Sequence, residues 1–238
     1  MTNAKEKIIV ALDVSAAGQA LDLFSRLRDV VGAFKIGSQI FTSEGHYVVR
    51  EIIKFGGKIF LDLKFHDIPN TVASAAIEAV HMGVFMFNVH ALGGSEMMKR
   101  TVNAVNETSA KEGLIKPKVI AVTVLTSSTK ETLNEVGIQQ EPLYQVVHLA
   151  KLASSCGMDG VVASPLEITA IRENVERDFV IVTPGIRPKG IGHDDQKRVM
   201  TPMEALHAGS DYLVIGRAIT HAPYPEQAAR KIIEELNS

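Results

Sequence analysis

The chain has 238 residues, of which 46% are hydrophobic and 5% aromatic, and its formal charge is −2. A chain of this length can bury a hydrophobic core large enough to fold without the help of disulfides or metal ions. Its single cysteine excludes an intramolecular disulfide. The near-neutral charge argues against a nucleic-acid partner, and no apolar run approaches the ~20 residues that cross a bilayer. Because the N-terminal segment lacks the composition of a targeting sequence, we expect a cytoplasmic protein without nucleic-acid or membrane partners.

Short runs of β-branched and aliphatic residues alternate along the chain with longer segments of helical spacing. The predicted strands are 8–13, 32–37, 58–64, 85–90, 118–124, 159–163, 179–183 and 211–215. The predicted helices are 17–29, 44–55, 71–82, 94–112, 141–156, 166–174, 202–208 and 225–237. Eight such units predict an α/β protein, a (β/α)8 TIM barrel formed by one domain over residues 1–238. A doubly wound open sheet is the alternative, but the glycine-rich turn that usually follows its first strand is absent.

Polar residues stand near the carboxyl ends of these strands, where a barrel of this kind has its active site. They are Asp13, Lys35, Asp62, Lys64, Asp67, His90, Thr123, Thr126, Ser164 and Thr183. Strand alternation puts Asp62 and Lys64 on one face and two apolar residues, Leu63 and Phe65, on the other. If the apolar pair packs against helices, the charged pair points into the barrel mouth. Charges are rarely buried there without a partner or a function.

Asp67 follows the third strand, and two readings of it are open. It either reaches an active site, its own or that of a neighbouring subunit, or caps the helix that begins near Pro69.

Two further segments are suited to an anionic ligand. Ile215-Gly216-Arg217 is typical of a strand end followed by the first turn of a helix, where exposed amides and a guanidinium bind phosphate. The connection 184–201 is longer than an ordinary link and contains three glycines, as a lid would, although a plain surface loop is the alternative. Within it, Arg187 and Gln196 are long enough to reach over a bound phosphate and base.

In their order along essentially the whole chain, these motifs resemble the bacterial orotidine 5′-phosphate decarboxylases. The motifs are Ala11-Leu12-Asp13, Phe34-Lys35-Ile36-Gly37, Asp62-x-Lys64-x-x-Asp67-Ile68-Pro69-Asn70-Thr71, Thr123-Val124-Leu125-Thr126-Ser127, Thr183-Pro184-Gly185-Ile186-Arg187 and Ile215-Gly216-Arg217. The Asp-x-Lys-x-x-Asp core alone is shared with a wider group of phosphosugar enzymes, whereas the ordered set is specific.

The resemblance implies decarboxylation of orotidine 5′-phosphate to UMP and CO2, the last step of UMP synthesis, without a cofactor or metal. Losing CO2 leaves a carbanion at C6, which a fixed cation in a water-poor cavity must stabilise. Lys64, held between Asp62 and Asp67, is such a cation, and its ammonium can then protonate C6. Lys35 completes the implied catalytic set.

The resemblance also implies a homodimer with shared active sites, to which Asp67, Ile68 and Thr71 come from the other subunit. Ribose contacts are expected from Asp13 and Lys35. The resemblance further implies that Thr126 contacts the pyrimidine. The implied phosphate contacts are Arg187, Gln196, Gly216 and Arg217.

Three other functions are weighed against this reading. A metal-dependent sugar-phosphate decarboxylase or aldolase would have a carboxylate ligand at the second strand's end, where this chain has Lys35. A phosphosugar epimerase would need acid and base groups on both faces of the substrate and usually metal-binding histidines, but His90 is the only histidine at a strand end. A non-catalytic nucleotide-binding barrel is the third alternative, and the intact Lys64 and Asp67 argue against it.

Overall fold

Eight parallel strands close into a single barrel in a computed structural model that describes residues 4–188 and 200–237. The strands are β1 (Ile8–Ala11), β2 (Ala33–Gly37), β3 (Ile59–Phe65), β4 (Met86–His90), β5 (Lys118–Val122), β6 (Gly160–Val162), β7 (Val180–Thr183) and β8 (Tyr212–Ile215). Each strand pairs with the next in the chain, and β8 pairs with β1. This closure confirms the predicted barrel and excludes the open sheet. All eight strand predictions are correct to within two residues at each end.

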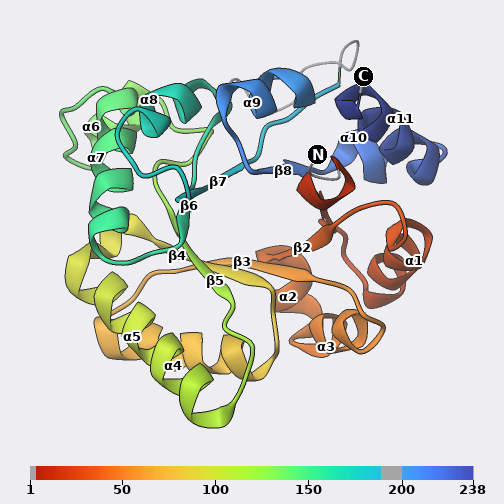
Figure 1. The fold of residues 1–238 in the computed structure, drawn as a ribbon, viewed down its shortest axis with the longest axis horizontal. Helices are drawn as coiled ribbons and strands as arrows, with labels where there is room; N and C mark the ends of the chain where they lie inside the picture. The colour runs from red at the N-terminus through yellow and green to blue at the C-terminus, as the bar shows by residue number, and fades with distance from the viewer. Residues whose placement is uncertain (1–3, 189–199, 238) are drawn as a thin grey trace.

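Helices surround the strands on the outside of the barrel (Figure 1). They are α1 (Ala17–Leu27), α2 (Ser38–Glu44), α3 (Tyr47–Lys54), α4 (Pro69–His81), α5 (Gly94–Glu112), α6 (Lys130–Glu135), α7 (Pro142–Ser155), α8 (Ile168–Arg172), α9 (Pro202–Ala208), α10 (Arg217–Thr220) and α11 (Pro225–Asn237). Short 3-10 turns are η1 (Ala4–Lys7), η2 (Ala91–Gly93) and η3 (Pro165–Glu167). None of the helices in the described residues is long and apolar enough to cross a membrane.

The helix predictions were wrong in two places. The helix predicted over 44–55 is the slightly shorter α3, and α2, which precedes it, was not predicted. Gly45, with a φ of 61°, ends α2 and separates the two helices. The polar helix α6 was missed because its sequence, Lys-Glu-Thr-Leu-Asn-Glu, has no apolar periodicity to indicate a helix.

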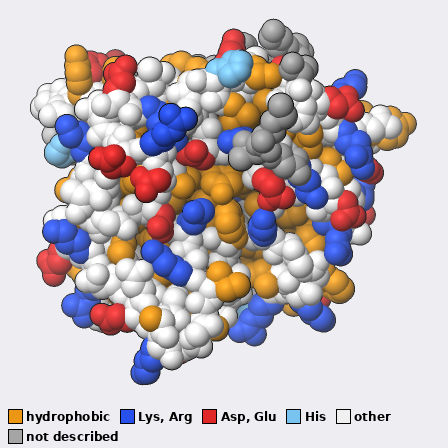
Figure 2. Space-filling model, in the orientation of Figure 1, with side chains coloured by type: hydrophobic (Ala, Val, Ile, Leu, Met, Phe, Trp, Pro, Cys, Tyr) orange, Lys and Arg blue, Asp and Glu red, His pale blue; other side chains and the backbone are white. Residues whose placement is uncertain are grey.

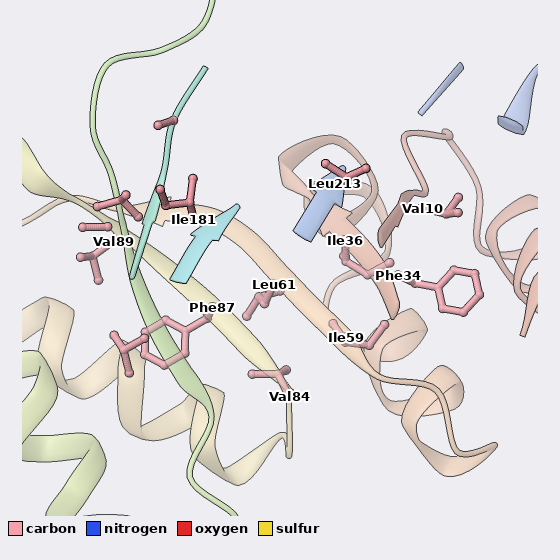
Figure 3. Close-up of a cluster of buried hydrophobic side chains, with 14 of the residues drawn as sticks. Val10, Phe34, Ile36, Ile59, Leu61, Val84, Phe87, Val89, Ile181 and Leu213 are labelled. Carbon is pink, nitrogen blue, oxygen red and sulfur yellow. The ribbon is translucent and has the colours of Figure 1, made fainter. Parts of the chain in front are cut away.

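Apolar side chains fill both faces of the barrel wall, as expected for parallel strands covered by helices. The interior layer consists of Ile9, Ala11, Ala33, Phe60, Met86, Ile120, Val182 and Val214. Residues one position along, such as Val10, Phe34, Leu61 and Phe87, point outward and pack against the helices (Figure 3). Because side chains alternate, the next interior-facing residues beyond the apolar layer are polar, and they include Lys35 and Asp62.

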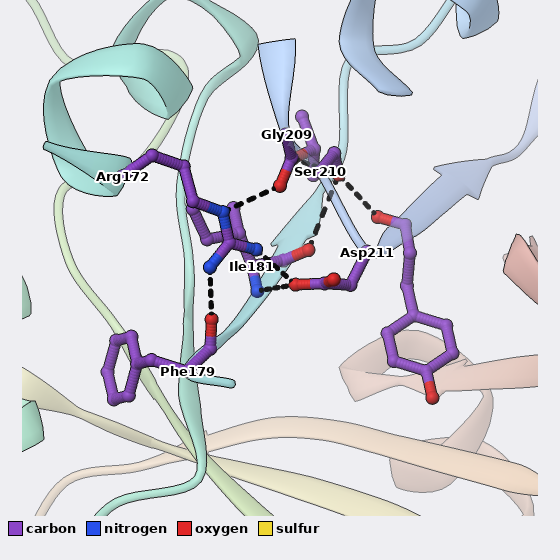
Figure 4. A network of polar contacts seen from close by, with 8 residues as sticks. Arg172, Phe179, Ile181, Gly209, Ser210 and Asp211 are labelled. Atoms are coloured by element: carbon purple, nitrogen blue, oxygen red, sulfur yellow. Dashed lines mark hydrogen bonds and ion pairs between the residues drawn. The ribbon is translucent and has the colours of Figure 1, made fainter. Parts of the chain in front are cut away.

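A network of polar contacts joins the amino ends of β7 and β8, at the end of the barrel opposite its mouth (Figure 4). The guanidinium of Arg172 donates to the carbonyls of Gly209 and Phe179 and forms an ion pair with the carboxylate of Asp211. The same carboxylate accepts the backbone N–H of Ile181 at 2.8 Å. These contacts tie α8 to two neighbouring strands.

On the face seen in Figure 2, basic and acidic side chains are interspersed rather than gathered into one large patch. This distribution agrees with the small net charge of the chain.

Candidate active site

A pocket of about 540 Å³ opens at the carboxyl ends of the strands. Its floor is the apolar interior layer, including Ala11, Phe60 and Val214. Most of the sequence-predicted site residues line it, namely Asp13, Lys35, Asp62, Lys64, Thr126, Arg187, Gly216 and Arg217. The structure therefore brings together residues more than 200 positions apart in the chain, above an apolar floor.

Four charged side chains of alternating sign form a row across one side of the pocket. The ammonium Nζ of Lys35 lies 2.8 Å from Asp13 Oδ1 and 3.4 Å from Asp62 Oδ2. The other oxygen of Asp62, Oδ1, accepts from Lys64 Nζ at 2.7 Å. The Lys64 side chain is 35% exposed, against 11% for Lys35. Lys64 is thus the more accessible of the two cations.

The buried Lys35 stays protonated because of its carboxylate neighbours. Burial alone would lower the pKa of its ammonium, but Asp62 first and Asp13 second outweigh this effect, and the pKa is raised above the usual 10.5. A fixed positive charge therefore lies between the two carboxylates at neutral pH.

The strand that carries Lys64 is irregular at this residue. Leu63 and Phe65 pack against the outer core, as predicted from alternation. Lys64, however, has a φ of 54°, and it is the only non-glycine residue with positive φ in the described chain. The pairing of β3 with β4 shifts register between Leu61 and Phe65, which marks a β-bulge. The strand therefore runs through Lys64 as predicted, but it contains a bulge that simple alternation does not predict.

Asn88 of β4 contacts both Asp62 and Lys64, and it was not among the predicted site residues. Its side chain is completely buried, its Oδ1 accepts the backbone N–H of Lys64 at 2.8 Å, and its Nδ2 donates to Asp62 Oδ1 at 2.7 Å. Strand alternation could have indicated it, because Asn88 is two residues beyond the interior-facing Met86 and therefore also faces the barrel interior.

The residues that follow β3 lie outside the pocket of their own chain. Asp67, Ile68 and Thr71 are exposed, with Ile68 at 67%, and none of them lines the pocket. Asp67 Oδ1 accepts the N–H of Ile68 at 2.6 Å, but α4 has no side-chain cap. The alternative interpretation of Asp67 as a helix cap is therefore wrong.

Arg187, which follows β7, and Gly216-Arg217, which follow β8, line the same pocket. Gly216 directly precedes α10, and Arg187 is largely buried. The backbone N–H of Arg187 donates to the carbonyl of Met200 at 3.0 Å, so the two ends of the predicted lid are held side by side. Gln196 lies in the segment 189–199, outside the described residues.

Several polar residues at strand ends face away from the pocket. Thr123 donates to the carbonyl of Val162, and the Thr183 hydroxyl accepts from Ser210. Conversely, four polar side chains that were not predicted as site residues line the pocket, namely Gln39, Ser127, Thr220 and His221. Each follows a predicted site residue by one to four positions, and that proximity was the signal.

His90 stacks on His66 with ring centroids 5.3 Å apart, beside Lys64. Burial first, then His66 and Lys64, lowers the pKa of the His90 imidazole to about 4. His90 is therefore neutral at neutral pH. No group of three or more His, Cys, Asp or Glu side chains in the described part of the chain is arranged to hold a metal ion.

Comparisons with known proteins agree with one another. A sequence model described as the orotidine 5′-phosphate decarboxylase / HUMPS family matches residues 6–232. An orotidine 5′-phosphate decarboxylase from Geobacter sulfurreducens is 56% identical over 233 residues, which cover 98% of this chain and 97% of the relative. Crystal structures of orotidine 5′-phosphate decarboxylases from Lactobacillus acidophilus and Pyrococcus horikoshii superpose with TM-scores of 0.85 and 0.77, at 40% and 28% identity. Each covers 97% of this chain, and this chain covers 99% of each.

Proposed function

The chain belongs to the orotidine 5′-phosphate decarboxylase / HUMPS family, and we propose that it converts orotidine 5′-phosphate to UMP and CO2 with the Lys64 ammonium as proton donor. The observation that carries this choice within the family is the row Asp13–Lys35–Asp62–Lys64. Lys35 occupies the position where a metal-dependent relative would need a carboxylate. Its ammonium repels a divalent cation and instead fixes the two carboxylates.

The charged row suits a reaction in which negative charge moves from a carboxylate to a carbon atom. When the C6–CO2 bond breaks, its electron pair stays on C6, and CO2 leaves as a neutral molecule. Lys64 is the accessible cation of the row and lines the pocket, so its charge can stabilise the C6 carbanion. An N–H proton of its ammonium then passes to C6 and gives UMP. No electron sink from a cofactor enters this sequence.

The rest of the pocket supplies contacts for each part of the nucleotide. Asp13 and Lys35 hold the ribose hydroxyls, and Thr126 contacts the pyrimidine. The phosphate is bound by Arg187, Gly216 and Arg217, which line the pocket. Gln196, which lies outside the described residues, is the fourth donor that the family resemblance implies. Binding energy from the phosphate, remote from C6, then serves to orient the reacting carboxylate beside Lys64.

The active site is completed by a second subunit of a homodimer. Support comes from the exposed segment after β3, because Asp67, Ile68 and Thr71 do not line the pocket of their own chain. Ile68 in this segment is 67% exposed, and Leu92, which follows the neighbouring strand β4, is 44% exposed. Large exposed apolar side chains of this kind are typical of a surface that is covered in an assembly. Each subunit is one domain formed by residues 1–238, and the enzyme works in the cytoplasm on a phosphorylated small molecule.

The test is the loss of the ultraviolet band of orotate when purified protein meets orotidine 5′-phosphate. Wild type should consume the substrate and Lys64→Ala should not. Lys54→Ala, which removes an exposed lysine far from the pocket lining, is the control and should behave as wild type. Near-normal turnover by Lys64→Ala would contradict its role as proton donor.

A second test addresses the metal-dependent alternative. Activity should survive dialysis against EDTA, because no step in the proposed reaction needs a Lewis acid. Loss of activity that Mg²⁺ restores would favour the metal-dependent decarboxylase or aldolase.

A further inference from the structure

The side chain of Asn88 is the only one in the described residues that is hydrogen-bonded both to the backbone of Lys64 and to its carboxylate partner. It is completely buried in the barrel interior, directly above the apolar Met86. Both halves of the amide are used, since Oδ1 accepts and Nδ2 donates, and this fixes the orientation of the amide. A buried group satisfied in this way is rigid and therefore suited to position its neighbours.

The backbone at Lys64 requires a partner that the sheet does not supply. Along the β3–β4 ladder, Leu61 pairs with Phe87, and the next pair is Phe65 with Val89. Three β3 residues, 62–64, thus face the single residue Asn88. The N–H of Lys64 would be left without a ladder carbonyl in this bulge, and the side chain of Asn88 accepts it instead.

The same amide also orients the carboxylate of Asp62. Asp62 Oδ1 receives Lys64 Nζ and Asn88 Nδ2, each at 2.7 Å, while Oδ2 faces Lys35 at 3.4 Å. Because Asn88 is neutral, it fixes this carboxylate without changing the charge of the row. Apolar residues of similar size would supply neither hydrogen bond, and an aspartate would bring two carboxylates together.

We propose that Asn88 is a positioning residue for the decarboxylation. It holds the backbone of Lys64 in its left-handed conformation and orients the Asp62 carboxylate, and together these contacts direct the Lys64 ammonium toward C6 of the substrate. The inference rests on the proposed function, since it gives Asn88 a role in that reaction. Asn88 does not line the pocket and acts through Lys64 and Asp62. Its loss should therefore affect turnover far more than binding of the nucleotide.

The first experiment compares Asn88→Ala with wild type in kcat, in KM for orotidine 5′-phosphate and in the dissociation constant of UMP. We expect kcat to fall by about 100-fold or more, because a displacement of about 1 Å at the reacting groups has this effect, with the UMP constant changed less than about threefold. Val105→Ala is the matched control, because it opens a cavity in the fully buried outer core at α5 and lowers stability away from the pocket. It should keep the wild-type kcat.

Two results would overturn the inference. One is an unchanged kcat in Asn88→Ala together with lowered thermal stability, which would make Asn88 purely structural. The other is an equal loss of kcat and UMP affinity, which would indicate collapse of the whole pocket. If wild type itself fails to consume orotidine 5′-phosphate, the proposed function fails instead.

Asn88→Asp adds a pH-dependent rescue that a merely structural role would not produce. A protonated carboxyl has the same shape as the amide, with an O–H that donates to Asp62 and a C=O that accepts from Lys64. Burial and the charge of Asp62 raise the pKa of a carboxyl at this site, and the cations Lys35 and Lys64 oppose that shift, while His90 is neutral. The ratio of kcat in Asn88→Asp to wild type should rise as pH falls from 8 to 5. A ratio that is constant or falls would contradict the inference.

Crystal structures of wild type and Asn88→Ala give a readout that needs no activity. If Asn88 positions Lys64, then in the variant alone Lys64 should leave the left-handed region, or its Nζ should move beyond hydrogen-bond distance of Asp62 Oδ1. Unchanged geometry at Lys64 would overturn the inference whatever reaction the protein catalyses.

Discussion

Two networks of charged side chains lie at opposite ends of the barrel and differ in how their charges are satisfied. At the amino ends of β7 and β8, Arg172 is bonded to two backbone carbonyls and to Asp211, whose carboxylate also accepts a backbone N–H. At the mouth, Lys35 and Lys64 contact carboxylates beside an open pocket. The first network connects elements of the scaffold, and the second presents charge to a ligand. The groups that each charge contacts, rather than burial or charge alone, therefore distinguish a stabilising network from one that faces a ligand.

The largest expected effect is at the mouth. Lys64→Ala should lower kcat by about 10⁴-fold or more, because it removes both the proton donor and the nearest positive charge. Its unfolding free energy should change little, since the side chain is partly exposed and its charge is not needed to join strands. The measurements are single-turnover kinetics and urea unfolding. If Lys64→Ala strongly lowered the free energy of unfolding, Lys64 would be a residue that stabilises the scaffold, as Arg172 is.

The second prediction concerns Asp67, which does not line the pocket of its own chain and is proposed to reach the pocket of the other subunit. Asp62→Ala and Asp67→Ala should each be inactive, and mixing them should restore activity to about a quarter of wild type. Random exchange makes half of the dimers mixed, and each mixed dimer has one intact site of two. Steady-state activity after denaturation and joint refolding gives the measurement. Mass spectrometry must confirm the exchange, and no recovery despite it would argue against an Asp67 shared between subunits.

Arg172→Ala is the corresponding change at the opposite end. It leaves the Asp211 carboxylate and two carbonyls without their guanidinium and should lower the unfolding free energy by about 3 kcal/mol. Turnover per folded molecule should remain at the wild-type level. Arg230→Ala is the matched control, because its exposed pair with Glu226 should contribute less than about 0.5 kcal/mol. A large loss of kcat in Arg172→Ala would show that the two networks are coupled.

The smallest expected effect is at His90, beside the mouth network. Its pKa is about 4 in the folded protein and near 6.5 in the unfolded chain, so the unfolded state binds more protons between these values. Stability should therefore fall as pH falls from 7 to 5. His90→Asn should remove a part of this loss on the order of 1 kcal/mol, allowing for partial exposure of the ring. Urea unfolding at both pH values measures it, with the exposed His148→Asn as control. An identical pH dependence in wild type and His90→Asn would contradict the lowered pKa.

The barrel and most of the residues that line its pocket could be predicted from the amino-acid sequence. Continuous apolar runs predict parallel strands that are buried on both faces. Eight such strands, alternating regularly with helical segments, predict a closed barrel. Because such strands all run in the same direction, polar residues that follow them in sequence must gather at one end. This is why Asp13, Lys35, Asp62 and Lys64 could be predicted to meet before their contacts were known.

The contacts between side chains of different strands and helices could not be predicted in the same way. The bulge at Lys64 depends on how β3 pairs with β4, and the importance of Asn88 follows from that pairing rather than from any local motif. The network of Arg172 likewise joins residues that are adjacent only after β7 and β8 pair. Local periodicity reports which face a side chain takes, but hydrogen-bond partners depend on register between strands. The charged row at the mouth was therefore visible in the sequence, and its support by Asn88 was not.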